Sequence, residues 1–544
     1  MTALPVLQHL IIVPVLLPLL AGAVMILIDE KRHGLKSAIS LLSTLALGAA
    51  AITLLLLVDG EHWEQGIGVY LASNWAAPFG FALMVDRLAA MMLVLTAMIA
   101  LAAQVFSVKS WGRIGVHFHS LFQFLLMGLN GAFLTNDLFN LFVFFEVMLA
   151  ASYGLVLHAY NPRRVQAGMQ YIAINLVASF LFLIGVALIY ASTGTLNLAD
   201  LSGRVAGLGA EDAYLLCIGA SVLALAFLIK SAVWPLGFWL PRTYSMASPP
   251  VGAMLVLMTK VGVYAMLRTW FAVFGDEAGA LTGFGFHALT VAGMATMAFG
   301  AIGMLASQEG GRMAGYGAIL SSGTLLALVG QFHGEVLAAG LYYLIGSTLA
   351  MSAFMLLVEL TDRIKPPGIS VLAVTMEAFA IEDNPEDPVG VGIPGTIAFL
   401  ALSFVACALV ISGMPPLAGF VAKFSVVHAI LGAASAAGDG VPAMAWALIV
   451  LLIAAGLAAI ISLMRFGVRT FWATTIGVPP KLRFSEAIPV GALLLFCVML
   501  TVGAGGVMAY LGRTAEGLMR NAEYAGRVLG EPPVVRVPGK GSAE

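Results

Sequence analysis

Four ionisable residues lie inside long apolar stretches of the sequence, where charged side chains are rarely found. Glu146 occurs in FFEVMLAASYGL, Lys230 in FLIKSAVWPLGFWLP, Lys260 in TKVGVY and Lys423 in PPLAGFVAKF. A lysine ammonium near the centre of a bilayer costs about 3 kcal/mol by insertion scales, and residues kept at such a cost usually serve a function. These four are therefore the candidate functional residues.

One carboxylate and three ammonium groups form a set suited to proton transfer. Burial alone would neutralise each group, whereas opposite charges placed together keep each other ionised. Because nearby charges in a low-dielectric interior interact strongly, a proton that reaches one group changes the proton affinity of the next. A sodium cage is disfavoured, since hard cations need several oxygen ligands and lysine repels them. A structural ion pair between Glu146 and Lys230 is the alternative, although buried pairs stabilise proteins poorly.

Two similar proline-containing segments lie next to lysines, one directly after Lys230 and the other shortly before Lys423. In SAVWPLGF and SGMPPLAGF a serine stands four residues before a proline, and the residues concerned are Ser231, Pro235, Ser412, Pro415 and Pro416. Proline lacks an N–H group, so the serine carbonyl loses its helical partner and the helix is expected to break there. The two segments fall in the seventh and twelfth predicted helices, an odd number apart. Unless the similarity arose by chance, it predicts inverted repeats, which are typical of secondary transporters.

Few other residues could extend this chemistry. His333 and Glu335 lie where the tenth and eleventh predicted helices meet, and they either gate an exit or cap a turn. His428 follows Lys423 by five residues and could continue a proton path. The sequence contains no phosphate-binding loop, no serine triad and no CxxC pair, so we expect no cofactor, no metal site and no enzymatic activity. The near-neutral net charge of −2 gives no reason to expect a nucleic-acid partner.

The elements that position these residues are predicted to be membrane-spanning helices. Hydrophobic residues make up 61% of the 544 residues and charged residues only 10%, whereas a soluble domain has about 25% charged residues. Because a span needs about 20 apolar residues, the sequence reads as about fourteen helices. Their approximate cores are 8–28, 36–58, 82–106, 115–134, 137–159, 165–192, 213–239, 246–271, 283–305, 313–331, 335–360, 393–432, 441–465 and 485–511.

The basic residues support this number of helices, because they alternate between successive loops. Outside the predicted tail, nearly all of them fall in odd-numbered loops: Lys31, Arg32, Lys36, Lys109, Arg113, Arg163, Arg164, Arg242, Arg312, Arg363, Lys365, Arg465, Arg469, Lys481 and Arg483. Basic loops face the cytoplasm in most membrane proteins. We therefore predict a multi-pass protein of the bacterial inner (plasma) membrane, with odd loops cytoplasmic and both termini outside.

These patterns predict an all-α polytopic membrane protein in which residues 1–511 form one transmembrane domain. The inverted five-helix repeats are expected at about 115–271 and 283–465, with the seventh and twelfth helices broken. Residues 512–544 are more polar and are expected to form a loosely ordered extramembrane tail. The segment 377–387 concentrates acid and is either a solvated loop or a surface for docking or for attracting cations; its acidic residues are Glu377, Glu382, Asp383, Glu386 and Asp387.

The motifs around the four candidates, together with PPVGAML, resemble the antiporter-like membrane subunits shared by respiratory complex I and the multisubunit monovalent cation/proton antiporters called Mrp, Mnh or Pha. VTMEAF before the acidic segment and VGIPGTIAFLALSFVACAL after it are most similar to the D subunits of those antiporters. The resemblance covers nearly the whole chain. It implies partner subunits of an antiporter complex, protons and Na⁺ or K⁺ as the transported ions, and no cofactor.

By the same resemblance, Glu146 matches the family's helix-five glutamate, and Lys230, Lys260 and Lys423 match its lysines in helices seven, eight and twelve. Glu146 and Lys230 are then expected to form a switching pair. One departure concerns helix eleven, where many relatives carry a histidine or lysine and this chain has only Gly346, Ser347 and Thr348. The link from Lys260 to Lys423 is then expected to use water, Ser347 or His333.

Two other functions remain open from the sequence. One is a proton-pumping subunit of an NADH–quinone oxidoreductase or a membrane hydrogenase, which would use the same chemistry. The other is a transporter that works as a single chain, which the family resemblance disfavours.

Overall fold

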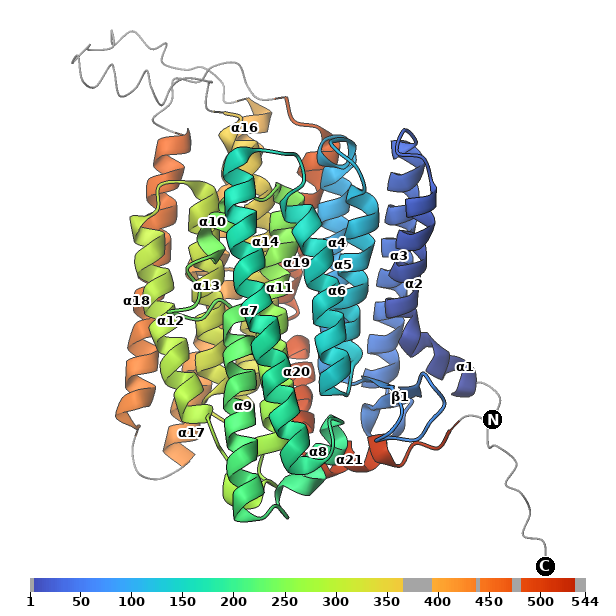
Figure 1. The fold of residues 1–544 in the computed structure, drawn as a ribbon. Coiled ribbons are helices and arrows are strands. Elements are labelled where there is room, and N and C mark those ends of the chain that lie inside the picture. The colour runs from blue at the N-terminus through green and yellow to red at the C-terminus, as the bar shows by residue number, and fades with distance from the viewer. Residues whose placement is uncertain (1–3, 365–393, 437–440, 472–480, 534–544) are drawn as a thin grey trace, which may run out of the picture.

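The computed structural model describes residues 4–364, 394–436, 441–471 and 481–533. Within these ranges thirteen helices are long and apolar enough to cross a membrane, so the chain is a multi-pass membrane protein (Figure 1). The principal helices are α2 (Val13–Leu27), α3 (His33–Asp59), α4 (Arg87–Ser107), α5 (Phe118–Leu134), α6 (Leu138–Val156), α7 (Pro162–Thr193), α9 (Ala210–Lys230), α11 (Pro249–Phe274), α12 (Phe286–Ala306), α13 (Gly310–Val329), α14 (Gly334–Asp362), α16 (Gly395–Ser412), α17 (Ala418–Ala436), α18 (Ala443–Phe471), α19 (Phe484–Val502) and α20 (Ala504–Met519).

Smaller elements complete the described fold: α1 (Leu4–His9), α8 (Leu198–Val205), α10 (Leu240–Met246), α21 (Asn521–Leu529) and an antiparallel pair of strands, β1 (Gly68–Leu71) and β2 (Ala82–Val85). The expectation that residues 82–85 begin a helix is wrong. Those four residues pair with β1, and α4 starts only after Asp86, whose side chain caps the helix by accepting from the Ala89 N–H.

The connections after α2 and α6 lie at one end of the bundle, which we call the upper face, whereas β1, α8 and α21 lie at the opposite end, the lower face (Figure 1). The upper face carries the odd-numbered connections, as the alternation of basic residues predicts. Both ends of the described chain lie toward the lower face. Which face meets the cytoplasm remains a prediction from the positive-inside rule.

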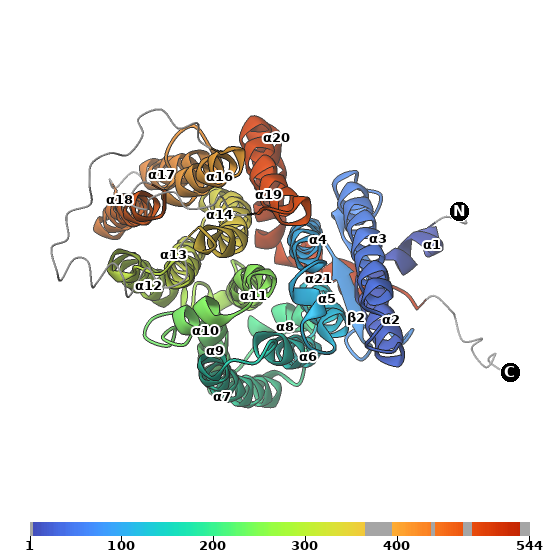
Figure 2. The same cartoon turned by 90° about the horizontal axis from the view of Figure 1, so that it is seen from above.

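α11 forms the centre of the bundle. It packs against α4, α5, α9, α13 and α14, and the views in Figures 1 and 2 show it surrounded by other helices. Every residue of α11 from Pro250 to Phe274 is buried. A helix that is apolar on every side, like this one, is expected to lie in an interior rather than at a surface. Lys260 is consequently at the centre of the molecule.

Both proline segments interrupt a helix. α9 ends at Lys230 and helical structure resumes with α10 at Leu240, while α16 ends at Ser412 and α17 starts at Ala418. Each interruption contains a cis peptide bond before a proline. α9 reaches its interruption from the lower face and α16 from the upper face (Figure 1). The two interruptions are thus approached from opposite faces, and the inverted repeat with its two five-helix units stays a prediction.

The expectation of a loosely ordered tail from residue 512 is wrong as far as residue 533. α20 continues to Met519, and α21 packs against α8. Asn521 donates to the Phe271 carbonyl at 2.7 Å, and the Tyr524 hydroxyl bonds to the Asn136 side chain. α21 folds because its apolar residues, Tyr524 and Val528, are four apart and share one buried face. Residues 534–544 and the acidic residues of segment 377–387 lie outside the described residues.

A buried ion pair joins α11 to the start of α4 near the lower face. Arg268 donates two hydrogen bonds to Asp86, at 2.6 and 2.7 Å. Burial alone would raise the pKa of the Asp86 carboxyl, but the charge of Arg268 and its hydrogen bonds outweigh burial and hold that pKa below its usual value. The pair therefore fixes the lower end of the central helix.

Candidate functional site

Glu146 lies half-buried on α6, and its carboxylate is hydrogen-bonded by a residue of the neighbouring helix α7. Ser179 donates a hydrogen bond to Glu146 Oε1. Tyr153 is two turns further along the same face of α6, and its ring meets the ring of Tyr171 edge-on at 5.5 Å. The Ser179 hydroxyl therefore holds the carboxylate between α6 and α7, and the Tyr171 hydroxyl bonds to Ser152 of α6.

Lys230, the last residue of α9, is only 6% exposed. Its ammonium lies 5.1 Å from the centre of the Phe145 ring, a distance at which a cation is attracted to an aromatic face. Within the described part of the chain Nζ has no hydrogen-bond partner. The structural ion pair between Glu146 and Lys230 is therefore not formed. Because neighbouring helical residues point in different directions, α6 presents Phe145 to the lysine and Glu146 to Ser179.

Lys230 lines a small cavity of about 20 Å³. A cavity of about 10–15 Å³ is large enough to hold one water molecule when polar partners are present. The polar residues that line this cavity beside Lys230 are Tyr171, Asn175, Tyr244 and Thr259. The cavity therefore suits a water molecule that hydrogen-bonds to the otherwise unsatisfied ammonium.

Lys260 is fully buried and reaches toward α13. Its ammonium donates to Ser322 Oγ at 3.2 Å and lies 3.5 Å from the Ala318 carbonyl oxygen. The adjacent residue, Ser321, donates to Ser347 of α14 at 3.0 Å. The neighbouring hydroxyls of α13 thus contact Lys260 through Ser322 and α14 through Ser321, and α14 itself contains no histidine or lysine.

Lys423 on α17 returns to the end of α16 across the second interruption. Its ammonium donates to the Ser412 carbonyl oxygen at 2.7 Å. Pro416 has no N–H, so the Ser412 carbonyl is expected to lack its helical hydrogen-bond donor. The Lys423 ammonium serves as the donor instead. At the first interruption the lysine stands before the proline instead of after it. The Lys230 ammonium has no hydrogen-bond partner among the described residues.

Two glycines allow these close approaches. A Cβ atom on Gly262 of α11 would lie 2.4 Å from Ser231 Oγ, and one on Gly456 of α18 would lie 2.6 Å from Lys423 Nζ. Both values are far below ordinary van der Waals contact. Gly262 therefore lets the end of α9 pack against the central helix, and Gly456 lets α18 cover the Lys423–Ser412 contact.

The accessory candidates lie apart from the lysines. His333 precedes α14 near the lower face, and its Nδ1 is buried without a partner among the described residues. Glu335 is exposed in the first turn of α14. His428 is exposed and stacks on Phe424, with ring centres 6.3 Å apart. The structure does not bring His428 together with Lys423, because the two residues lie on different sides of α17.

The residues missed by sequence reasoning are mainly hydroxyl partners: Ser179, Tyr171, Tyr244, Thr259, Ser321 and Ser322. Only Ser321 and Ser322 left a signal, since they form a polar run in the apolar helix GGRMAGYGAILSSGTLLALV. Within the described ranges no group of three or more histidine, cysteine or acidic residues could hold a metal ion.

Comparison with known proteins relates the whole chain to one family. Residues 135–440 match the family model described as NADH:quinone oxidoreductase/Mrp antiporter, transmembrane. The chain is 50% identical over 530 residues to the D subunit of a probable K⁺/H⁺ antiporter of Rhizobium meliloti, covering 97% of this chain and 98% of the relative. It is 31% identical to the D subunit of the Na⁺/H⁺ antiporter of Alkalihalophilus pseudofirmus, over 96% of this chain and 100% of the relative.

The fold is also similar to a chain in the solved structure of the Mrp complex from Dietzia sp. DQ12-45-1b. The TM-score is 0.81 at 26% sequence identity, and the match covers 97% of this chain and 100% of that one. The resemblance inferred from the motifs is confirmed. The chain belongs to the NADH:quinone oxidoreductase/Mrp antiporter family of transmembrane proteins, among the D subunits of its multisubunit cation/proton antiporters.

Proposed function

We propose that the chain moves protons through the membrane as one subunit of a complex that exchanges Na⁺ or K⁺ for H⁺. The observation that carries this proposal is the placement of three lysines in the bundle, each with its ammonium against a polar cavity, hydroxyl or carbonyl. Lys230 faces a water-sized cavity, Lys260 bonds to Ser322, and Lys423 bonds to the Ser412 carbonyl. Each arrangement offers a site at which a proton can arrive or leave.

Entry from the upper face is proposed to pass Tyr244. A cavity of about 230 Å³ near that face is lined by Trp111, Arg164, Glu359 and Tyr244. Tyr244 also lines the small cavity at Lys230. Tyr244 is therefore the side chain that lines both the large polar cavity and the cavity at the first lysine.

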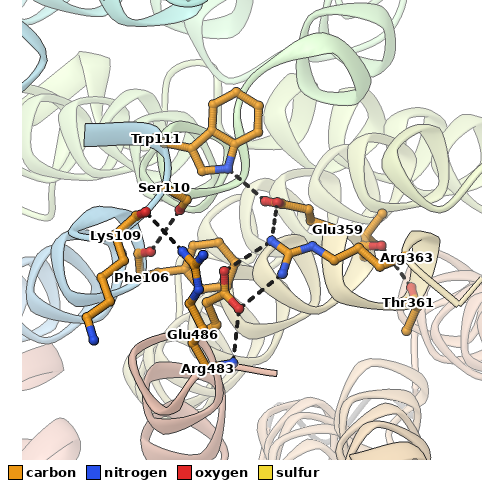
Figure 3. Close-up of polar contacts among 10 residues, drawn as sticks. Phe106, Lys109, Ser110, Trp111, Glu359, Thr361, Arg363, Arg483 and Glu486 are labelled. Carbon is orange, nitrogen blue, oxygen red and sulfur yellow. Dashed lines mark hydrogen bonds and ion pairs between the residues drawn. The ribbon is translucent and has the colours of Figure 1, made fainter. Parts of the chain in front are cut away.

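The acidic rim of the large cavity is held by a set of charged contacts. The Trp111 indole N–H donates to Glu359 at 2.8 Å, and Arg363 binds Glu359 at 2.6 Å and Glu486 at 3.0 Å (Figure 3). Arg483 donates to the Lys109 carbonyl at 3.1 Å and brings α19 into the same set (Figure 3). These contacts fix a carboxylate beside the proposed entry.

From Lys230, the proposed path continues along the central helix. Thr259 lines the Lys230 cavity and is adjacent in sequence to Lys260. The Ser322 and Ser321 hydroxyls then lead to Ser347, and Lys423 lies on α17, which packs against α14. Glu146 is proposed to change the charge state of Lys230 through space, because the two groups are near but not bonded. Each proton that arrives alters the charge that its neighbour experiences.

The transported cation, the cellular membrane and the orientation are parts of the same proposal. The two relatives are named for K⁺ and for Na⁺, and the described residues contain no group of three or more histidine, cysteine or acidic residues that could hold either ion. We place the cation path in or beside a partner subunit. The protein is proposed to lie in the bacterial plasma membrane with the basic upper face toward the cytoplasm, and to act as a transporter subunit that catalyses no reaction of its own.

Copurification and transport together test this proposal. The chain would be expressed with the subunits encoded next to it, or alone, in a host that lacks its own antiporters. We expect small antiporter subunits to copurify, and vesicles to release protons on addition of NaCl or KCl only when the whole complex is present. Copurification with iron–sulfur or flavin subunits would instead establish the respiratory function, and transport by the chain alone would contradict a subunit role.

A further inference from the structure

A second polar cavity at the upper face has a strongly basic lining. It measures about 270 Å³ and is bordered by α7, α10, the start of α13 and the connection before α13. Three arginines line it, Arg163, Arg242 and Arg312, with Glu309 as the one acidic residue. The lining therefore carries a formal excess of two positive charges. α10, which contributes Arg242, lies between α7 and α13 when the bundle is viewed from above (Figure 2).

The arginine side chains have few partners of their own. Within the described residues, those of Arg163 and Arg242 form no hydrogen bond or ion pair, and Arg312 has only a 3.3 Å contact with exposed Glu309. All three arginine side chains are exposed, so water and salt screen part of their mutual repulsion, and a bound anion would relieve the rest. Gly311 makes the arrangement possible, since a Cβ atom there would lie 2.8 Å from Ser245 Cα. α13 can therefore start directly against α10, which brings Arg312 into the same cavity as Arg242.

Large apolar side chains are exposed on the chain segment that leads to this cavity through α10 and on the flanking helices α7 and α12. α10 leads from the first interruption to the upper face, and the interruption exposes Trp234 by 49% and Phe238 by 51%. The backbone N–H of Trp234 donates to the Thr296 hydroxyl of α12 at 3.0 Å, so this segment lies against α12. Met169 of α7 and Ile302 of α12 are also exposed. The surface is thus basic at the upper face and apolar toward the membrane interior.

We propose that this surface binds an anionic phospholipid, with its phosphate at Arg163, Arg242 and Arg312 and its acyl chains along Trp234 and Phe238. The charge of the cavity fits a phosphate group, and arginine is well suited to bind phosphate through two parallel hydrogen bonds. The exposed apolar residues favour a lipid over a soluble phosphate, which would leave them uncovered. Basic cavities between helices on the cytoplasmic side are a known form of lipid headgroup site. The proposal requires no proton transport by the chain.

The test measures lipid binding by the intact purified complex. A triple variant, R163Q/R242Q/R312Q, removes the three charges of the cavity. A matched control, R113Q/R469Q/K481Q, removes three exposed charges elsewhere at the same face, two from connections and one from the last turn of α18. Both complexes would be exchanged into phosphatidylcholine micelles and titrated with phosphatidylglycerol, with the bound lipid counted by native mass spectrometry. The amount of this chain in each complex is measured in the same spectra, which separates lost binding from lost assembly.

We expect the control to bind phosphatidylglycerol as the wild type does and the cavity variant to bind it about 100-fold more weakly. This follows from about 1 kcal/mol for each basic residue at a charged membrane surface, with 1.4 kcal/mol for each factor of ten. Equal binding by the cavity variant and the control would overturn the proposal. Displacement of the lipid by excess inorganic phosphate would overturn it in favour of a soluble anion. Loss of a partner subunit from the cavity variant alone would overturn it in favour of an acidic protein segment.

Discussion

Replacing Gly456 by alanine would disturb the second helix interruption without changing any titratable group. The added Cβ atom would lie 2.6 Å from Lys423 Nζ and 2.8 Å from the Ser412 carbonyl oxygen, whereas ordinary contact begins at 3.4 Å. The lysine side chain can bend away, but the carbonyl belongs to the backbone. Because the lysine side chain is the most easily moved of these groups, we expect the substitution to separate the two groups of the 2.7 Å Lys423–Ser412 hydrogen bond.

The size of the effect follows from the strength of that bond. A hydrogen bond to a charged group contributes about 1.5–3 kcal/mol. If Lys423 must hold this position to pass protons, losing the bond lowers the rate by about 10-fold to 150-fold. The assay is proton flux driven by NaCl or KCl in vesicles that contain the whole complex, normalised to the amount of complex.

Gly48→Ala is the matched control for this substitution. Gly48 lies within α3, and a Cβ atom there would meet only Ala97 at an ordinary 3.7 Å. We expect the flux of this control to equal that of the wild type. If Gly456→Ala shows the same flux as Gly48→Ala at equal assembly, the Lys423–Ser412 contact has no part in transport and the reasoning is refuted.

The remaining predictions concern the hydroxyl path and the central helix. Ser347→Ala removes the hydroxyl that accepts from Ser321, so we expect proton flux to fall, whereas Ser347→Thr keeps a hydroxyl and should keep the flux. Wild-type flux in the alanine variant would exclude this path. Tyr244→Phe keeps the aromatic ring that lines both cavities but removes its hydroxyl, and we expect slower proton flux in a normally assembled complex. Wild-type flux would show that the hydroxyl carries no proton. Asp86→Ala leaves Arg268 buried without its counter-charge, which costs about 3–5 kcal/mol; an unchanged thermal midpoint of the purified complex would contradict this assignment.

Most of the transmembrane helices could be predicted because lipid imposes a simple requirement. A spanning segment must satisfy its own backbone hydrogen bonds and must be apolar for about 20 residues. The central helix containing Lys260 was therefore placed within three residues at each end. The pairing of residues 82–85 with β1 was missed, because the strand is as apolar as the helix that follows it. α21 was missed because nine residues of a polar amphipathic helix carry no membrane signal.

The four ionisable residues could be found because a charge in an apolar stretch is a strong sequence signal. Their partners could not, since the direction of each side chain depends on the rotation of its helix. Sequence alone could not tell that Phe145, rather than Glu146, would lie against Lys230. Nor could it show that the freed Ser412 carbonyl would be taken by Lys423. Serine hydroxyls are common in membrane helices, so Ser179 gave no signal of its contact with Glu146.

Cation-driven proton flux by Glu146→Ala and Lys230→Ala variants tests the central claim most directly. The measurement would use vesicles containing the complete complex, with all of its subunits quantified after copurification. The proton-transfer role of both residues predicts that flux is abolished in either variant while the complex still assembles. Flux equal to that of the wild type in fully assembled variants would contradict it.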